Sequence, residues 1–192
     1  PFESDFKISG DGYRPEGDFL QGEKKISPLE KPTLALLLLN CALCNDAGLQ
    51  TEPDANGEPQ WAIVGDPTEG ALVTLAQKAG LEKATLDYEF PRLHECPFSS
   101  ERKRVSVVVE VPKTNRLGIN SQARVLAKGS AEMLLNRCNR IGRGGRAITA
   151  EDRQSILAKI EAFANEGGRV LGFAYRPTDN PDHNNDSSKS DS

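Results

Sequence analysis

The stretch Val105-Ser106-Val107-Val108-Val109-Glu110 has the alternation of a β-strand with at least one buried face. A loop follows at 112–120, and Ala123-Arg124-Val125-Leu126-Ala127 then has the composition of a partner strand. The two runs predict an antiparallel hairpin. A strand-rich middle of this kind argues against a parallel Rossmann-type sheet.

Helices are predicted on both sides of the hairpin from apolar periodicity and capping residues. Asp66 is a good N-cap, Pro67 fits the first helical position, and Glu69 lies three residues after the cap, as a capping box requires. Glycines are expected to end several of these helices. The predicted helices cover residues 32–44, 66–80, 129–135 and 149–165, and further strands are expected at 61–64 and 169–175.

The pattern as a whole predicts one α+β domain at 20–176, with a mainly antiparallel twisted sheet flanked by helices. Residues 1 to about 29 are rich in Gly, Pro and acidic side chains and are expected to form an extended entry segment with one short strand, of which residues 1–19 precede the domain. Residues 177–192 consist mostly of Asp, Asn, Ser and Pro. These cannot build a core, so a disordered polar tail is expected there.

Composition excludes several classes of function for this chain of 192 residues. The net charge of −4 gives no general field that would attract nucleic acid or an anionic membrane. No segment has the roughly 18–20 consecutive apolar residues of a spanning helix. Cys41 and Cys44 have C-x-x-C spacing without a second pair. We therefore expect half-buried free thiols on a helix in a reducing compartment rather than a zinc site.

Four short motifs could carry chemistry, and each has a purely structural alternative. The first is a capping sequence, the second an aromatic residue before a charge run, the third a lysine at a helix start, and the fourth an arginine at a strand edge. If these motifs are purely structural, the aromatic residue belongs to the hydrophobic core, and the charged side chains that follow it are simply exposed to solvent. The motifs are Gly65-Asp66-Pro67-Thr68-Glu69, residues 97–104 (PFSSERKR), Lys128-Gly129-Ser130-Ala131-Glu132 and Gly168-Arg169-Val170-Leu171.

Taken in order, these motifs resemble the nucleotide-binding domain of type II P-type cation-transporting ATPases, the group of calcium, sodium and proton pumps. Asn45-Asp46 and residues 10–17 are also similar to that family. Two positions depart from its pattern. Ala131 replaces a proline at a helix start, and Ser100 stands where the calcium pump of muscle has an arginine. The resemblance therefore predicts one phosphate contact fewer here.

The resemblance implies an adenine-nucleotide site. Phe98 would stack on the base, and Glu69 would accept a hydrogen bond from the adenine amine. Lys103 and Lys128 would place charges along the ribose and phosphates, and Arg169 would hold a β-phosphate or ribose oxygen. Gly129 would permit close backbone approach. No catalytic or metal-binding residue is expected. The seven implied nucleotide-binding residues are Glu69, Phe98, Ser100, Lys103, Lys128, Gly129 and Arg169.

The resemblance also implies a place in a larger pump. The chain looks like an insert between the two halves of a phosphorylation domain, with residues 1–19 proximal to the hinge. It contains no D-K-T-G-T sequence, so we expect it to bind ATP, as Mg-ATP in the intact pump, and not to hydrolyse it. Its expected partners are the phosphorylation and actuator domains on the cytoplasmic side of a membrane, and the isolated fragment is expected to be a monomer. Calcium is the expected cation.

Two other classes remain open at this point. One is a non-enzymatic protein-interaction module with no nucleotide site, in which Phe98 is a core residue. The other is a free-standing hydrolase of the haloacid dehalogenase type, which the missing aspartate motif argues against.

Overall fold

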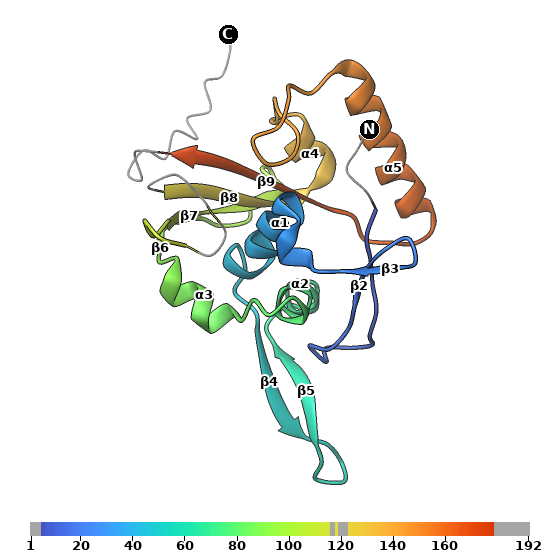
Figure 1. Cartoon of the computed structure of the whole chain (residues 1–192), viewed down its shortest axis with the longest axis vertical. Helices are drawn as coiled ribbons and strands as arrows, with labels where there is room; N and C mark the ends of the chain where they lie inside the picture. The colour runs from blue at the N-terminus through green and yellow to red at the C-terminus, as the bar shows by residue number, and fades with distance from the viewer. Residues whose placement is uncertain (1–4, 116–117, 119–122, 179–192) are drawn as a thin grey trace.

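An antiparallel four-stranded sheet, in the order β6-β7-β8-β9, forms the centre of the molecule (Figure 1). The computed structural model describes residues 5–115, 118 and 123–178. The strands are β6 (Arg92–Cys96), β7 (Arg104–Glu110), β8 (Ala123–Ser130) and β9 (Leu171–Thr178). Val107 pairs with Leu126, so the predicted hairpin is confirmed.

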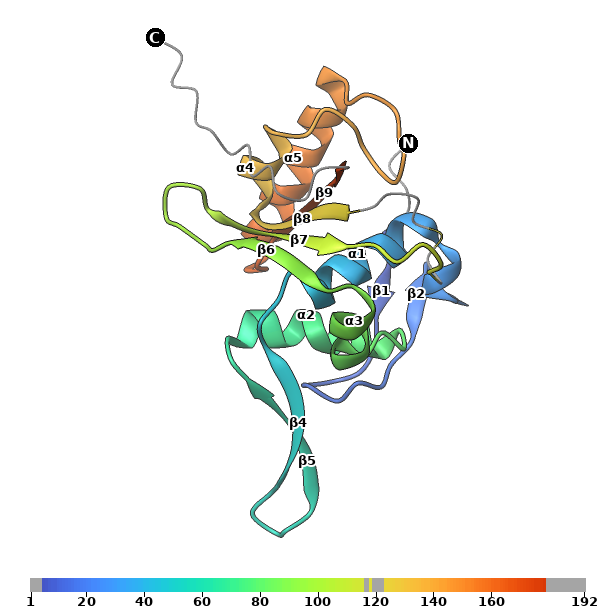
Figure 2. The same cartoon turned by 90° about the vertical axis from the view of Figure 1, so that its left-hand side faces the viewer.

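Helices cover both faces of this sheet (Figure 2). On one side lie α4 (Ala131–Leu135) and α5 (Ala150–Asn165). On the other side lie α1 (Pro32–Leu43), α2 (Pro67–Lys78) and α3 (Lys83–Glu89). The prediction of an α+β fold with an antiparallel sheet flanked by helices is therefore confirmed.

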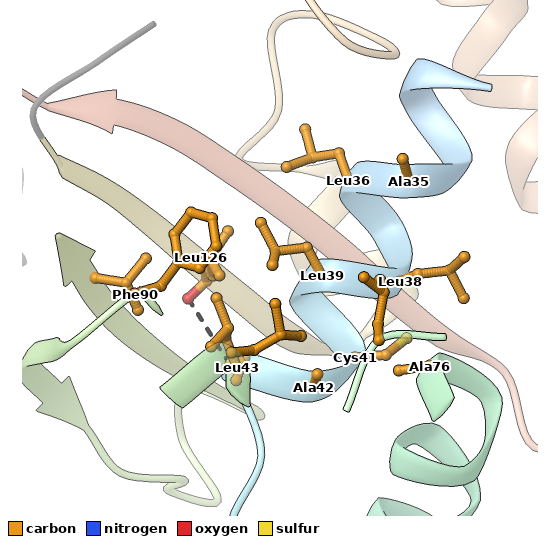
Figure 3. Close-up of a cluster of buried hydrophobic side chains, with 14 of the residues drawn as sticks. Ala35, Leu36, Leu38, Leu39, Cys41, Ala42, Leu43, Ala76, Phe90 and Leu126 are labelled. Atoms are coloured by element: carbon orange, nitrogen blue, oxygen red, sulfur yellow. Dashed lines mark hydrogen bonds between the residues drawn. The ribbon is translucent and has the colours of Figure 1, made fainter. Parts of the chain in front are cut away.

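The core is organised around α1, because nine of its twelve residues are buried. A helix that is apolar nearly all round must be covered on every side. Figure 3 shows Leu36, Leu39 and Leu43 on the side of Leu126 and Phe90, whereas Cys41 lies on the side of α2. The alternating valines of β7 pack in the same core as α1. They are Val105, Val107 and Val109.

The strand predicted at 61–64 belongs to a two-stranded hairpin that projects away from the core (Figures 1 and 2). It consists of β4 (Gly48–Pro53) and β5 (Pro59–Val64). The polar composition of residues 52–58 is typical of a loop, but Glu52 and Pro53 pair with Gln60 and Pro59. Most of β4 is exposed and lacks apolar alternation, so its strand state depends on backbone pairing. Helix α3 was missed as well.

The N-terminal segment forms three short strands rather than the single one expected. They are β1 (Lys7–Ile8), β2 (Phe19–Gln21) and β3 (Lys24–Ile26), followed by the 3-10 turn η1 (Pro28–Glu30). Phe19 is buried in the core, although residues 1–19 were expected to lie outside the domain. Lys78 Nζ also donates to the carbonyls of Ser9 and Gly10, at 2.7 and 3.3 Å.

Two element boundaries differ from those expected because neighbouring strands extend them. Gly129 and Ser130 belong to β8, and Ser130 caps α4 by accepting a hydrogen bond from the Met133 amide at 3.4 Å. Strand β9 continues to Thr178, which pairs with Ala123. The expected polar tail thus begins inside a strand, and its residues 179–192 lie outside the described part of the chain.

The thiols of Cys41 and Cys44 are fully buried, not half-buried as expected, and both are free. Burial raises the pKa of Cys41 to about 12 and that of Cys44 to about 11. The positive charge of Lys128 opposes both shifts only in part. These thiols are packing groups in the core.

We expect a thiol reagent at pH 8 to modify Cys96 first and Cys138 more slowly, because burial raises the pKa of the Cys138 thiol. Cys41 and Cys44 should stay unmodified in the folded protein, because only the thiolate reacts. Mass spectrometry after labelling would locate the adducts. The denatured chain is the control and should label at all four cysteines. Rapid native labelling of Cys41 would contradict the closed core.

Candidate functional site

The first turn of α2 positions Glu69. Asp66 caps the helix, with its Oδ1 accepting from the amides of Thr68 at 2.8 Å and Glu69 at 3.1 Å. These amide hydrogen bonds, that of Glu69 first, lower the pKa of Asp66. The predicted N-cap is therefore confirmed, but the reciprocal half of the capping box is wrong. The Glu69 carboxylate instead accepts from the amide of Asp46 at 3.1 Å and pairs with Lys128.

The ion pair between Lys128 and Glu69 joins the central sheet to α2. Lys128 Nζ lies 2.6 Å from Glu69 Oε1, and the two side chains are 7% and 26% exposed. Lys128 projects from β8 on the face that packs against α1. A buried ammonium group without a partner would be costly, and Glu69 supplies that partner.

Asn45 fixes the backbone around this ion pair. Its Nδ2 donates to the carbonyls of Cys41 and Glu69, both at 2.9 Å. Its Oδ1 accepts from the amide of Ala47 at 2.9 Å. The C-terminal end of α1 and the first turn of α2 are thereby held together. The backbone that carries the Glu69 side chain is therefore fixed in position.

Phe98 lies in the turn between β6 and β7 and is 64% exposed. The alternative that made Phe98 a core residue is therefore wrong. Ser100 and Lys103 in the same turn are also exposed. Lys103 adopts a left-handed backbone conformation, with φ of 50°, and its amide donates to the Ser99 carbonyl at 2.7 Å. The turn is thus closed by its own backbone and presents an aromatic face to solvent.

Gly129 lies directly opposite Arg104 in the sheet. A Cβ at Gly129 would come within 2.3 Å of the Lys103 carbonyl oxygen and 2.6 Å of Arg104 Cα. The amide of Ser130 donates to the same Lys103 carbonyl at 2.9 Å. The close approach that this glycine permits is therefore between β8 and the end of the Phe98 turn.

Arg169 is exposed just before β9, and its Nη1 donates to Thr68 Oγ1 at 2.5 Å. This contact brings a residue distant in sequence to the first turn of α2. Thr68 was not among the predicted site residues, although it belongs to the quoted Gly65–Glu69 motif. Neither its role nor that of the Asp46 amide could be inferred without the tertiary contact.

The described contacts therefore link the predicted residues in two groups. Glu69, Lys128 and Arg169 meet around the first turn of α2. Phe98, Ser100, Lys103 and Gly129 belong to the β6–β7 turn and its support. Together they offer an aromatic face, a fixed carboxylate and exposed cations, which suits a planar base that carries an amine and an anionic tail.

Within the described residues, no group of three or more His, Cys, Asp or Glu side chains could hold a metal ion. In that same part of the chain, no helix has the length and apolar character needed to cross a bilayer.

The sequence profile of the P-type ATPase cytoplasmic domain N matches residues 33–192. The chain belongs to this family. It is similar to a calcium-transporting ATPase of Bacillus subtilis (strain 168), with 33% identity over 174 residues, 90% of this chain and 18% of that protein. Its identity to the cation-transporting ATPase pma1 of Synechocystis sp. is 36% over 183 residues, 93% of this chain and 19% of the relative.

A eukaryotic pump shows the same relation. The sodium/potassium exporting P-type ATPase cta3 of Schizosaccharomyces pombe is 36% identical over 166 residues, 85% of this chain and 15% of the relative. This N domain thus spans less than a fifth of the length of these relatives, which are calcium and other cation pumps. N domains of P-type ATPases generally bind ATP.

The Lys128–Glu69 pair should contribute to the free energy of unfolding through direct coupling. We expect Glu69→Gln and Lys128→Met each to lower the free energy of unfolding by about 1–3 kcal/mol, because each leaves a partly buried group unpaired. The double variant should recover part of that loss. Urea unfolding of the four proteins measures the coupling.

The pair Lys159–Asp5, joined at 2.7 Å with side chains 47% and 80% exposed, is a solvent-exposed control. Its coupling should be about 0.5 kcal/mol or less. Equal coupling in the two pairs would mean that the Lys128–Glu69 contact has no special structural importance.

Proposed function

We propose that this N domain binds adenine nucleotide at the surface formed by the Phe98 turn, the first turn of α2 and the start of β9. The observation that carries the proposal is the exposure of Phe98 beside a turn with exposed polar and cationic side chains. A single exposed apolar side chain is common on protein surfaces, so the support comes from the combination of Phe98 with the exposed Ser100 and Lys103 of the same turn.

The base would lie flat on Phe98, with its exocyclic amine directed to Glu69. Stacking of a base on an aromatic ring contributes about 1–3 kcal/mol. Glu69 is suited to the amine because its carboxylate is already fixed by the Asp46 amide and by Lys128. Such preorganisation lowers the entropic cost of binding.

The phosphates would lie along the exposed cations Lys103 and Arg169, with Ser100 as a neutral hydrogen-bonding group. Arg169 lies beside the first turn of α2 through its contact with Thr68, and its exposed guanidinium can bind phosphate oxygens there. Lys128 acts differently from the role expected from sequence. Because its charge is paired with Glu69, it supports the base-binding carboxylate more than it attracts phosphate.

In an intact pump, the domain would present the γ-phosphate of Mg-ATP to an aspartate of the phosphorylation domain, on the cytoplasmic side of a membrane. Phosphoryl transfer depends mainly on positioning and charge stabilisation. The N domain would supply affinity and delivery. Its partners would be the phosphorylation and actuator domains, and calcium is the cation that we propose for transport.

Phe98→Ala should weaken ATP and adenosine binding by roughly tenfold to a hundredfold, through the loss of about 1–3 kcal/mol of stacking. Phe98→Trp should retain binding. NMR shift titration or calorimetry measures both affinities. Phe163→Ala, at an exposed phenylalanine of α5, is the control and should bind like the unmodified chain. Unchanged affinity in Phe98→Ala would exclude the stacking role.

Substitutions of Lys103 and Lys128 should differ in how strongly they change the affinity for ATP relative to that for adenosine, which lacks phosphate. Lys103→Ala should weaken ATP by about three- to tenfold and adenosine little, because an exposed cation interacts mainly with the anionic tail. Lys128→Ala should weaken ATP and adenosine by similar factors. Lys113→Ala is a control that removes an exposed charge elsewhere. Selective loss of ATP in Lys128→Ala would restore its assignment as a phosphate ligand.

A further inference from the structure

A cavity of about 1000 Å³ is bounded by the first turns of α1, by parts of β7, β8 and β9, and by residues 137–145. It comes near the proposed nucleotide surface only at Arg104, which follows Lys103 and pairs with Gly129. None of the seven proposed nucleotide-binding residues lines it. Its position and its lining make it a separate candidate for ligand binding.

The lining of this cavity carries charge of one sign. Among the described residues that line it there are six arginines and no aspartate, glutamate or lysine. In a chain with a net charge of −4, such a local excess of guanidinium groups does not follow from composition. The arginines are Arg104, Arg124, Arg137, Arg140, Arg143 and Arg176.

Arg124 is a buried arginine of this lining with unsatisfied nitrogen atoms. It is only 7% exposed, and its Nε and Nη1 have no hydrogen-bond partner among the described residues. Its guanidinium lies 4.7 Å from the centroid of the Tyr175 ring. Burial lowers the pKa of Arg124, Tyr175 opposes this, and nearby Arg143 lowers the pKa further. Lys128, on the same strand, has a carboxylate partner at 2.6 Å, whereas no carboxylate of residues 5–115, 118 and 123–178 pairs with Arg124.

The first turn of α1 adds an independent attraction for anions at the same cavity. Lys31 is the N-cap and makes no side-chain capping bond, and the turn contains no acidic residue. Thr33 Oγ1, which lines the cavity, accepts from the Arg143 amide at 3.4 Å. The positive end of the helix dipole and its free amides favour an anion here.

Tyr175 holds the arginine-bearing loop against this site. Its hydroxyl accepts from the Gly144 amide at 2.8 Å and donates to the Gly142 carbonyl at 3.2 Å. The ring that contacts Arg124 therefore also fixes the backbone that carries Arg143. The cationic groups are preorganised before any ligand arrives.

We propose that this cavity is an oxyanion site that binds free inorganic phosphate or pyrophosphate, with Arg124 as the central ligand and Arg143 and the first turn of α1 beside it. The forked guanidinium matches two oxygens of a phosphate group. A bound dianion would also compensate the buried charge of Arg124. The site is separate from the nucleotide surface and does not depend on the function proposed there.

The test follows the side-chain Nε–Hε resonance of Arg124 in the full chain, by NMR, during titration with phosphate and then pyrophosphate at constant ionic strength. We expect a saturable shift of this resonance. The measurement needs no variant, so it stays decisive even if substitutions at position 124 impair folding. Absence of a shift at tens of millimolar anion would overturn the proposal.

Thermal unfolding of variants provides a second readout. Arg124→Met removes the charge and keeps an apolar chain over Tyr175. We expect it to melt at a higher temperature than the unmodified chain without anion, and to lose at least about tenfold in phosphate affinity. Arg14→Met, at an exposed arginine of the N-terminal segment, should respond like the unmodified chain. Equal phosphate stabilisation of the Arg124→Met and Arg14→Met variants would overturn the site.

Aspartate side chains of this chain are an alternative source of the oxygen atoms that would bind Arg124. Asp179 and Asp182 follow β9 in the sequence. A chain with Asp179→Asn and Asp182→Asn should give the same phosphate titration if the ligand is a free anion. If the Arg124 resonance moves on this double exchange and not on phosphate addition, the chain's own aspartates are the source of the oxyanion. The proposal for free phosphate is then wrong.

Discussion

The ion pair between Lys128 and Glu69 is the contact on which the geometry of the proposed nucleotide surface depends. It joins the central strand β8 to the first turn of α2 at 2.6 Å. Asn45 holds the end of α1 to the same turn, and Arg169 reaches it through Thr68. Segments far apart in the sequence thus meet at the first turn of α2, and the buried ammonium group of Lys128 requires the Glu69 carboxylate there as its partner.

Strand β8 carries two buried cations, Lys128 and Arg124, on one face and four positions apart. Their surroundings differ. Lys128 is paired, so its charge is used to hold Glu69 in place. Arg124 lies roughly 13 Å further along the strand by ordinary strand geometry. Its Nε and Nη1 find no hydrogen-bond partner in the described part of the chain, in a cavity lined by other arginines. The Lys128–Glu69 pair fixes the position of Glu69. The buried charge of Arg124 is the group for which we propose a bound anion.

The local features of the fold could be predicted from the sequence because each has a local physical cause. Helix α1 was found from its apolar run after Pro32, and the N-cap of α2 from Asp66 and Pro67. The capping box at Thr149 and Asp152 likewise marks the start of α5. The β4 strand and the full lengths of β8 and β9 were missed, because partner strands supply the hydrogen bonds that extend them.

The sequence by itself determined the antiparallel hairpin, the helix starts, the family resemblance and the identity of the residues proposed to bind nucleotide. Only the tertiary structure decided that Glu69 turns away from its own helix cap to pair with Lys128, and that Phe98 faces solvent. It also decided that Arg124 is buried with its Nε and Nη1 unsatisfied by any described residue. Propensity and capping act over a few residues, and sequence patterns record them. The partner of a buried charge is set by which distant segments pack together, and no local pattern encodes that choice.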